Sequence, residues 1–196
     1  MPKVTKTSEI FKAAEKVYET VGLDRATVTD ICEEADISRK TFYQRFKSLD
    51  ELLDSLLHYI SETTIAEIHN LNGKTEEDCW ERLWRMLDIY NEIGRVHPIV
   101  RALYSARFDR WVSWKQFTFA DKLDQIIHRL LTEAIQSGIS KGKFRETDAG
   151  AVAKIITAVA STNFFYYSNS SIFPESSAED IKNGLKLMVE RTLKPI

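Results

Sequence analysis

The sequence has few of the residues that interrupt regular structure or cross-link a small fold. Its 196 residues include only seven glycines and four prolines, so long segments without secondary structure are not expected. The two cysteines, Cys32 and Cys79, lie far apart, which argues against a disulfide framework and favours a reducing, cytoplasmic setting. There is no run of 18 apolar residues and no apolar signal-peptide core near the first residues. We therefore expect no transmembrane helix and no membrane partner.

An excess of charge of one sign is lacking as well. The chain has 27 Lys and Arg residues against 29 Asp and Glu residues, a formal net charge of −2 and a pI of about 6.1. This balance argues against a protein that coats nucleic acid through bulk positive charge. It leaves room for a local basic patch, because a site-specific DNA reader needs positive charge only where it contacts phosphate.

Motifs typical of catalysis, cofactor binding or metal binding are also missing. The histidines His58, His69, His97 and His128 are scattered without the HxxxH or HExxH spacing of a metal site. No glycine-rich phosphate loop, GxSxG turn or paired-cysteine motif is present. We therefore expect no enzyme, no cofactor and no metal ion, and the histidines are interpreted as ordinary surface or core residues.

Apolar residues recur at three- and four-residue spacing almost throughout, which is the pattern of amphipathic helices. Alternating strand patterns are absent, so the predicted fold class is all-α. The turn at Asn72, Gly73 and Lys74 is a plausible domain edge. Helices are predicted at about 8–21, 28–35, 39–46, 48–71, 75–95, 98–108, 113–138, 148–167 and 178–193.

The most informative stretch is 27–46, TVTDICEEADISRKTFYQRF. It predicts two short helices joined by a tight turn at Asp36 and Ile37, with Thr27 or Thr29 capping the first helix and Ser38 the second. A helix that enters the major groove must present side chains of its first turn to base edges. Because the second helix begins with basic and hydroxyl side chains, the stretch predicts a helix-turn-helix DNA reader.

The side chains of the second helix divide into three groups. Arg39 is suited to a two-pronged contact with guanine, Gln44 to adenine, and Thr41 to a thymine methyl group or a phosphate. Lysines and tyrosines are suited to phosphates, which fix register rather than sequence, and Ile37, Phe42 and Phe46 supply the apolar packing side. The predicted DNA-binding residues are Thr29, Ser38, Arg39, Lys40, Thr41, Tyr43, Gln44 and Lys47.

Charge is arranged locally around this stretch. Four basic residues and no acidic residue lie between positions 38 and 47, whereas the preceding helix carries Asp30, Glu33 and Glu34. That distribution explains how a chain with a near-neutral charge can keep a basic reading face. The alternative from spacing alone is an ordinary capped surface helix with a solvated basic side.

The stretch resembles the DNA-binding domain of TetR-family transcriptional regulators over about residues 10–53. The resemblance implies that Thr41 and Tyr43 contact the phosphate backbone and that the second helix lies in the major groove. Two positions depart from the family pattern: Asp36 stands where glycine is usual, and Leu49 where a phosphate-contacting lysine is common. Asp tolerates a left-handed backbone better than most residues, and Lys47 is a candidate substitute for the lysine. The matching positions are Gly22, Thr27, Val28, Ile31, Ala35, Ile37, Ser38, Thr41, Phe42, Tyr43, Phe46, Ser48, Glu51 and Leu52.

The same resemblance implies the organisation of the rest of the chain. An N-terminal three-helix DNA-binding domain at 1–47 precedes a helical ligand-binding and dimerisation domain at 48–196, and the helix at 48–71 links them. The last two helices are expected to form the interface of a homodimer, which suits a palindromic operator. The alternative is that their apolar residues only fill the subunit's own core. The predicted interface residues are Val152, Ile155, Ile156, Val159, Ile181, Leu185, Met188 and Val189.

Aromatic residues crowd the second domain, and the resemblance implies an effector pocket enclosed there. Aromatic and apolar walls suit a small hydrophobic or aromatic ligand, although an aromatic residue is often only core filling. The candidate lining residues are Trp84, Trp111, Trp114 and Phe117.

The sequence therefore predicts a repressor that a small molecule releases from a palindromic double-stranded DNA operator. Two other classes stay open. One is a helical protein-interaction module that has lost operator binding, for which Leu49 is the motivating departure. The other is a small α-helical enzyme, which no motif supports.

Overall fold

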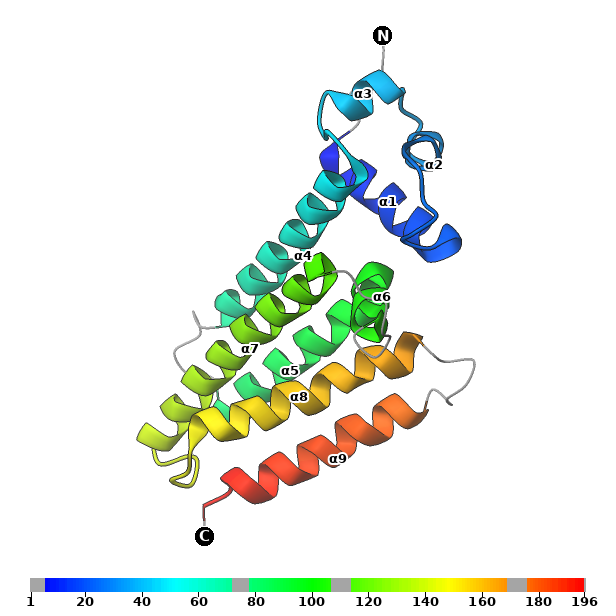
Figure 1. The fold of residues 1–196 in the computed structure, drawn as a ribbon. Coiled ribbons are helices and arrows are strands. Elements are labelled where there is room, and N and C mark those ends of the chain that lie inside the picture. Colours follow the sequence, from blue (N-terminus) through cyan, green and yellow to red (C-terminus); the bar gives the residue numbers. More distant parts are fainter. Residues whose placement is uncertain (1–5, 72–77, 107–113, 169–175, 196) are drawn as a thin grey trace. The chain divides into compact units, whose positions relative to one another are not determined.

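The structure is a computed structural model that describes residues 6–71, 78–106, 114–168 and 176–195, with side chains for 6–70, 78–103, 122–163 and 179–195. Every regular element in these ranges is an α-helix, which confirms the predicted all-α class (Figure 1). The helices are α1 (Thr7–Val21), α2 (Val28–Glu34), α3 (Arg39–Tyr43), α4 (Leu49–Leu71), α5 (Cys79–Val96), α6 (Pro98–Ala106), α7 (Trp114–Ser140), α8 (Ala149–Ser168) and α9 (Ser176–Leu193).

The chain forms two compact units. The first unit comprises Met1–Thr63 with His97–Ile99, and the second comprises Thr64–Val96 with Val100–Ile196. The division falls inside α4, so this helix belongs to both units. The sequence placed the domain edge at 47/48, just before α4, whereas the observed division between the units falls within α4. The assignment of functions to the domains 1–47 and 48–196 stays a prediction.

Local capping interactions explain where the helices of the first unit begin. The Thr27 hydroxyl accepts a bond from the Asp30 amide at 3.3 Å, and the Asp30 carboxylate accepts from the Thr27 amide at 2.8 Å. Ser38 caps α3 in the predicted way. Ser48 caps α4, since its hydroxyl accepts from the Glu51 amide at 3.2 Å, while the Glu51 carboxylate accepts from the Lys47 amide at 2.5 Å. Each such cap stabilises its helix by about 1 kcal/mol.

Aromatic rings form much of the core of the first unit. Phe42 is fully buried, and its ring centroid lies 5.7 Å from that of Phe46 and beside the edge of Tyr43. Phe11 on α1 lies 6.1 Å from Phe46 and 5.4 Å from Tyr59 on α4. Burying each large apolar side chain contributes about 2 kcal/mol. The apolar side of α3 therefore packs as predicted, and it fixes the direction of the opposite, polar side.

The second unit is built on contacts among α5, α7, α8 and α9, which lie side by side in Figure 1. Buried alanines on α8, Ala153 and Ala160, allow the neighbouring helices to approach closely. The loop after α7 folds Phe144 against Gly138, where an added Cβ would meet the ring at 2.1 Å. Asp148 caps α8, since its carboxylate accepts from the Ala151 amide at 2.9 Å.

Candidate nucleic-acid interface

The turn between α2 and α3 has the geometry of a helix-turn-helix. Asp36 adopts a left-handed backbone with φ of 51°, and it is the non-glycine residue with positive φ in the described chain. The Ile37 amide then bonds back to the Cys32 carbonyl at 2.9 Å, which closes the end of α2. The expectation that Asp36 replaces a glycine in this turn is confirmed. A left-handed backbone disfavours most residues but is tolerated by Asp because its short side chain bonds locally.

Ser38 sets the start of α3. Its hydroxyl oxygen accepts from the Thr41 amide at 3.1 Å and lies 2.9 Å from the Thr41 hydroxyl oxygen. Hydrogen-bonded helical geometry continues to the Phe46 amide, which bonds to the Phe42 carbonyl at 2.9 Å. The helix itself ends at Tyr43, three residues earlier than predicted, because the chain tightens into a turn before α4.

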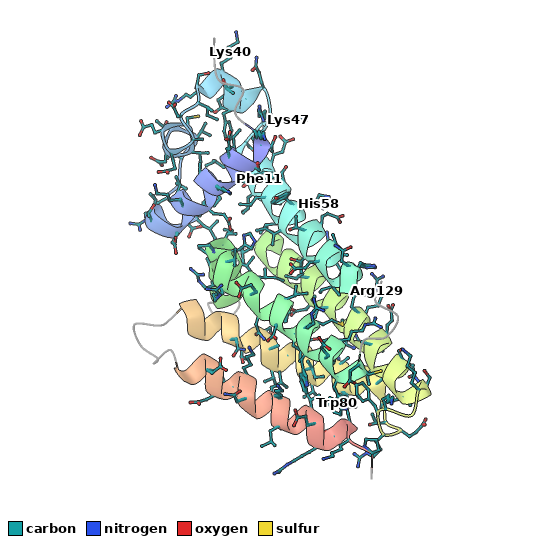
Figure 2. All side chains as sticks on the ribbon, turned by 180° about the vertical axis from the view of Figure 1, so that it is seen from behind. Phe11, Lys40, Lys47, His58, Trp80 and Arg129 are labelled. Atoms are coloured by element: carbon teal, nitrogen blue, oxygen red, sulfur yellow. The ribbon has the colours of Figure 1, made fainter. Side chains whose placement is uncertain are left out.

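Most of the predicted DNA-binding residues are exposed in the structure. Tyr43 is 55% exposed although it is aromatic, and an exposed aromatic side chain beside basic residues suits a contact outside the fold. Figure 2 shows Lys40 and Lys47 at the α3 end of the first unit. Ser38, Arg39, Lys40, Tyr43, Gln44 and Lys47 are exposed, and Thr29 and Thr41 are half-buried.

Side-chain bonds connect the three helices of the first unit around this motif. Arg39 Nη2 donates to the Thr29 hydroxyl on α2 at 2.5 Å. Arg45 Nη1 donates to the Thr7 hydroxyl on α1 at 2.9 Å. The Lys16 ammonium lies 2.6 Å from the Glu34 carboxylate, which joins α1 to α2. These bonds hold the arrangement of the helices, and they were not visible in the sequence because their partners are far apart along the chain.

These contacts change the expected charge pattern. Arg45 was one of the four basic residues of the predicted reading face, but it is half-buried and its side chain points to α1. The exposed basic residues are therefore Arg39, Lys40 and Lys47. On α2, the Asp30 carboxylate is engaged in the helix cap, since it also accepts from the Thr27 hydroxyl at 2.8 Å. The basic surface is smaller than the sequence predicted, yet it lies wholly at the α3 end.

Two titratable groups of the first unit have a shifted pKa because they are buried. Burial raises the pKa of Tyr18 to about 12, and the negative charge of Asp50 acts in the same direction. Burial also raises the pKa of the Cys32 thiol, while the positive charge of Arg39 opposes that shift. A thiol that is held protonated is a poor nucleophile and metal ligand. Cys32, which is buried and free, therefore acts as a small core residue.

The second unit contains a groove between α5 and α9. It has a volume of about 200 Å³, and Trp84 lines it together with Leu87, Asp88, Asn91, Lys182 and Lys186, among others. The Lys186 ammonium lies 5.2 Å from the centre of a Trp84 ring, and the Lys182 ammonium lies 2.9 Å from the Asp88 carboxylate. Of the other predicted pocket residues, Trp111 lies outside the described residues. Trp114 and Phe117 belong to α7, but their side chains lie outside the described part.

A buried pair of amides adjoins this groove through Asn91. Asn163 on α8 is fully buried, and its Nδ2 donates to Asn91 Oδ1 on α5 at 2.9 Å. Asn91 Nδ2 in turn donates to the Leu87 carbonyl at 2.9 Å, so the orientation of both amides is fixed. Asn163 Oδ1 has no hydrogen-bond partner among the described atoms. A buried acceptor without a partner is uncommon in proteins and calls for an explanation.

Burial divides the predicted dimer residues into two groups. Ile155 and Met188 are 54% and 58% exposed, and Val152, Val159 and Ile181 are half-buried. Ile156, Leu185 and Val189 are at most 5% exposed within the subunit, so for these three the structure favours the alternative of core filling. Helical periodicity identified their apolar character but did not distinguish a core contact from a subunit contact.

The described residues support neither a metal site nor a membrane-spanning helix. In the described part of the chain, no group of three or more His, Cys, Asp or Glu residues is placed to hold a metal ion. None of the helices over those residues combines the length and apolar character that crossing a membrane requires. The helix-turn-helix is therefore the feature of the described structure with the clearest functional geometry.

Comparison with known proteins supports the assignment of the helix-turn-helix as a DNA-binding motif. Residues 10–56 match the family model for bacterial regulatory proteins of the tetR family. The transcriptional repressor KstR2 of Mycobacterium tuberculosis (strain ATCC 25618 / H37Rv) is 24% identical over 153 residues, which are 78% of this chain and 76% of the relative. The crystal structure of a TetR transcription regulator from Haloarcula marismortui shares the fold with a TM-score of 0.80, at 20% identity and over 96% of this chain and 98% of that one.

A third similar protein is the fatty acid degradation regulator FadR of Bacillus halodurans. Its structure matches with a TM-score of 0.75 at 18% identity, over 95% of this chain and 97% of that chain. The family match covers the same residues that form the helix-turn-helix, and the fold match extends over both units. Residues 10–56 therefore form a DNA-binding domain of the tetR family of bacterial regulatory proteins, and the chain is a DNA-binding transcriptional regulator.

Proposed function

We propose that this regulator is a homodimeric repressor that binds a palindromic operator and leaves it when a small, largely apolar molecule binds the second unit. The observation that carries the DNA-binding part is the exposed α3 side. On α3 and just after it, Arg39, Lys40, Tyr43, Gln44 and Lys47 are exposed, whereas Phe42 is fully buried. A short capped helix with base-reading and phosphate-binding side chains on its free side suits the major groove. KstR2, a similar protein, is named a repressor, which supports repression over activation.

The proposed dimer surface is narrower than the sequence suggested. Ile155 on α8 and Leu187 and Met188 on α9 are all at least half exposed. Large apolar side chains that stay in water favour burial by a partner, and the outer sides of the last two helices are where the family resemblance places it. A two-fold dimer would present two copies of α3 to successive major grooves, and a palindromic operator matches that symmetry.

The proposed effector is a small molecule with an apolar body and at least one hydrogen-bond donor. Trp84 and Leu87 offer apolar surface in the groove, and Asn91 borders the same groove. Asn163 Oδ1 is a buried acceptor whose partner is not within the described structure. A donor that satisfies this oxygen removes a penalty of about 1–3 kcal/mol. That gain would favour the ligand-bound state over the operator-bound state, since only differential binding shifts such an equilibrium.

The operator part is tested by selecting genomic DNA fragments that the purified protein retains. Recovery of a palindrome, bound in a salt-dependent manner, supports the proposal. Lys47→Ala should weaken every duplex similarly and lower the salt dependence by about one counterion. Absence of any enriched palindrome would instead favour the protein-interaction module, for which Leu49 at the start of α4 is the motivating departure.

The effector part is tested with matched probes on the protein bound to its selected operator. The fold shared with a fatty acid degradation regulator makes 1-decanol and its methyl ether suitable, because they differ by one hydrogen-bond donor. We expect the alcohol to release the operator at a lower concentration than the ether. The Asn163→Leu variant should lose this difference while still binding DNA. Equal release by both probes, or by neither, would contradict a donor-dependent site of this kind.

A further inference from the structure

The side chain of Arg39 connects the two helices of the helix-turn-helix. Arg39 is the first residue of α3, and Thr29 is the second residue of α2. Arg39 Nη2 donates to Thr29 Oγ1 at 2.5 Å, across ten residues of sequence. The guanidinium therefore has a fixed contact on the first helix of the motif before any DNA is present.

Both ends of this contact are held in place. On α2, Thr29 lies inside the capping box that Thr27 and Asp30 form around it, and its β-branched side chain has few rotamers. On α3, the Ser38 cap fixes the backbone at Arg39. A free arginine loses up to about 2 kcal/mol of rotamer freedom when it is immobilised. The Thr29 contact removes part of that freedom in advance, which favours later binding through pre-organisation.

The contact leaves Arg39 able to read a base. A guanidinium has five N–H donors, and one of them points to Thr29. A two-pronged contact with the O6 and N7 atoms of guanine uses two more. The Arg39 side chain is also exposed, so neither the donor count nor burial prevents the guanine contact.

We infer that Thr29 is a positioning residue that presents the Arg39 guanidinium to one guanine of the operator. This inference rests on DNA binding by the family and does not depend on repression or on the effector. Thr29 on α2 would thereby contribute to the base preference of Arg39 on α3. This positioning role separates Thr29 from Lys40 and Lys47, whose roles are with phosphate.

Two other roles for these residues make different predictions. If the Thr29 hydroxyl only contacts a phosphate, its loss weakens binding to every sequence and lowers the salt dependence. If Arg39 only braces α3 against α2, its loss lowers stability and leaves base preference unchanged.

The test measures base preference at every operator position by selection from randomised duplexes, with salt dependence measured on the preferred duplex. Arg39→Ala identifies the position that Arg39 reads. Thr29→Val keeps the shape but removes the acceptor, and it should reduce the guanine preference at that position about 2- to 10-fold, with other positions and the salt dependence unchanged. Thr29→Ser keeps a hydroxyl and should retain the preference.

Thr7→Val is the matched control. It removes the acceptor of the Arg45 bond, an equivalent Arg–Thr contact on α1, and it should leave base preference unchanged. Thermal unfolding verifies that each variant is folded, and Thr29→Ala replaces Thr29→Val if the latter is not. Unchanged guanine preference in the valine or alanine variant overturns the inference. A uniform loss of affinity with a lower salt dependence, or a serine variant that behaves like the valine variant, overturns it as well.

Discussion

Replacing the buried Asn91–Asn163 pair by two leucines should stabilise the second unit. Leucine has the same branching of heavy atoms as asparagine and no polar atoms. In the parent protein the unpartnered Asn163 Oδ1 lowers the stability by about 1–3 kcal/mol. The double substitution removes this oxygen and its penalty. It also removes the 2.9 Å bond between the two side chains, but both partners of that bond disappear together. The Leu87 carbonyl loses one donor, yet it keeps the main-chain bond of the helix.

The single substitutions give the opposite sign or a smaller effect. Asn91→Leu leaves Asn163, which is 0% exposed, with neither of its amide atoms paired. We expect it to lower the free energy of unfolding by about 2 kcal/mol. Asn163→Leu removes the unpartnered oxygen but leaves Asn91 Oδ1 without its donor. Because Asn91 borders the groove, water can replace that donor, and the change should be within about 1 kcal/mol of zero.

Urea unfolding followed by circular dichroism measures these differences. The double variant should gain about 1–3 kcal/mol, or about 3 to 9 °C in melting temperature for a chain of this length. It should also respond equally to 1-decanol and its methyl ether, since the acceptor that distinguishes them is gone. A double variant less stable than the parent, with Asn91→Leu nearly neutral, would refute the reasoning, because it would mean that the buried oxygen is already satisfied.

Three further predictions concern other parts of the chain. Gly138→Ala should destabilise the second unit by about 2 kcal/mol in urea unfolding, because its Cβ would meet the Phe144 ring at 2.1 Å and overpacking costs about 1–3 kcal/mol. Adding Phe144→Leu should restore part of this loss. An unchanged stability of the Gly138→Ala variant would contradict the packing of Phe144 against Gly138. Asp36→Gly should stabilise the first unit by about 0.5–1 kcal/mol in thermal unfolding, since φ of 51° suits glycine better; a loss of stability would show that the Asp side chain stabilises the turn. Tyr43→Phe removes a hydroxyl from a 55% exposed ring and should weaken all duplexes about 3- to 10-fold in fluorescence anisotropy, whereas a loss confined to one sequence would place Tyr43 on a base instead.

The sequence by itself determined the features that depend on neighbours along the chain. The caps at Thr27, Ser38 and Ser48, and the left-handed turn at Asp36, involve residues within a few positions of one another. Their side-chain types therefore carry the information directly. Apolar periodicity likewise specified helices and the buried side of α3, because spacing of three and four residues follows from helix geometry. The family resemblance rested on these same local features.

Only the tertiary structure decided which distant side chains meet. The Arg45–Thr7 bond spans 38 residues and the Asn163–Asn91 bond spans 72, and no local pattern specifies such pairs. Periodicity marked Ile156 and Ile155 alike as apolar, but packing buries the first within the subunit and leaves the second exposed. The physical reason is that periodicity fixes the side of a helix that avoids water, whereas the identity of the surface that covers it depends on how the helices pack.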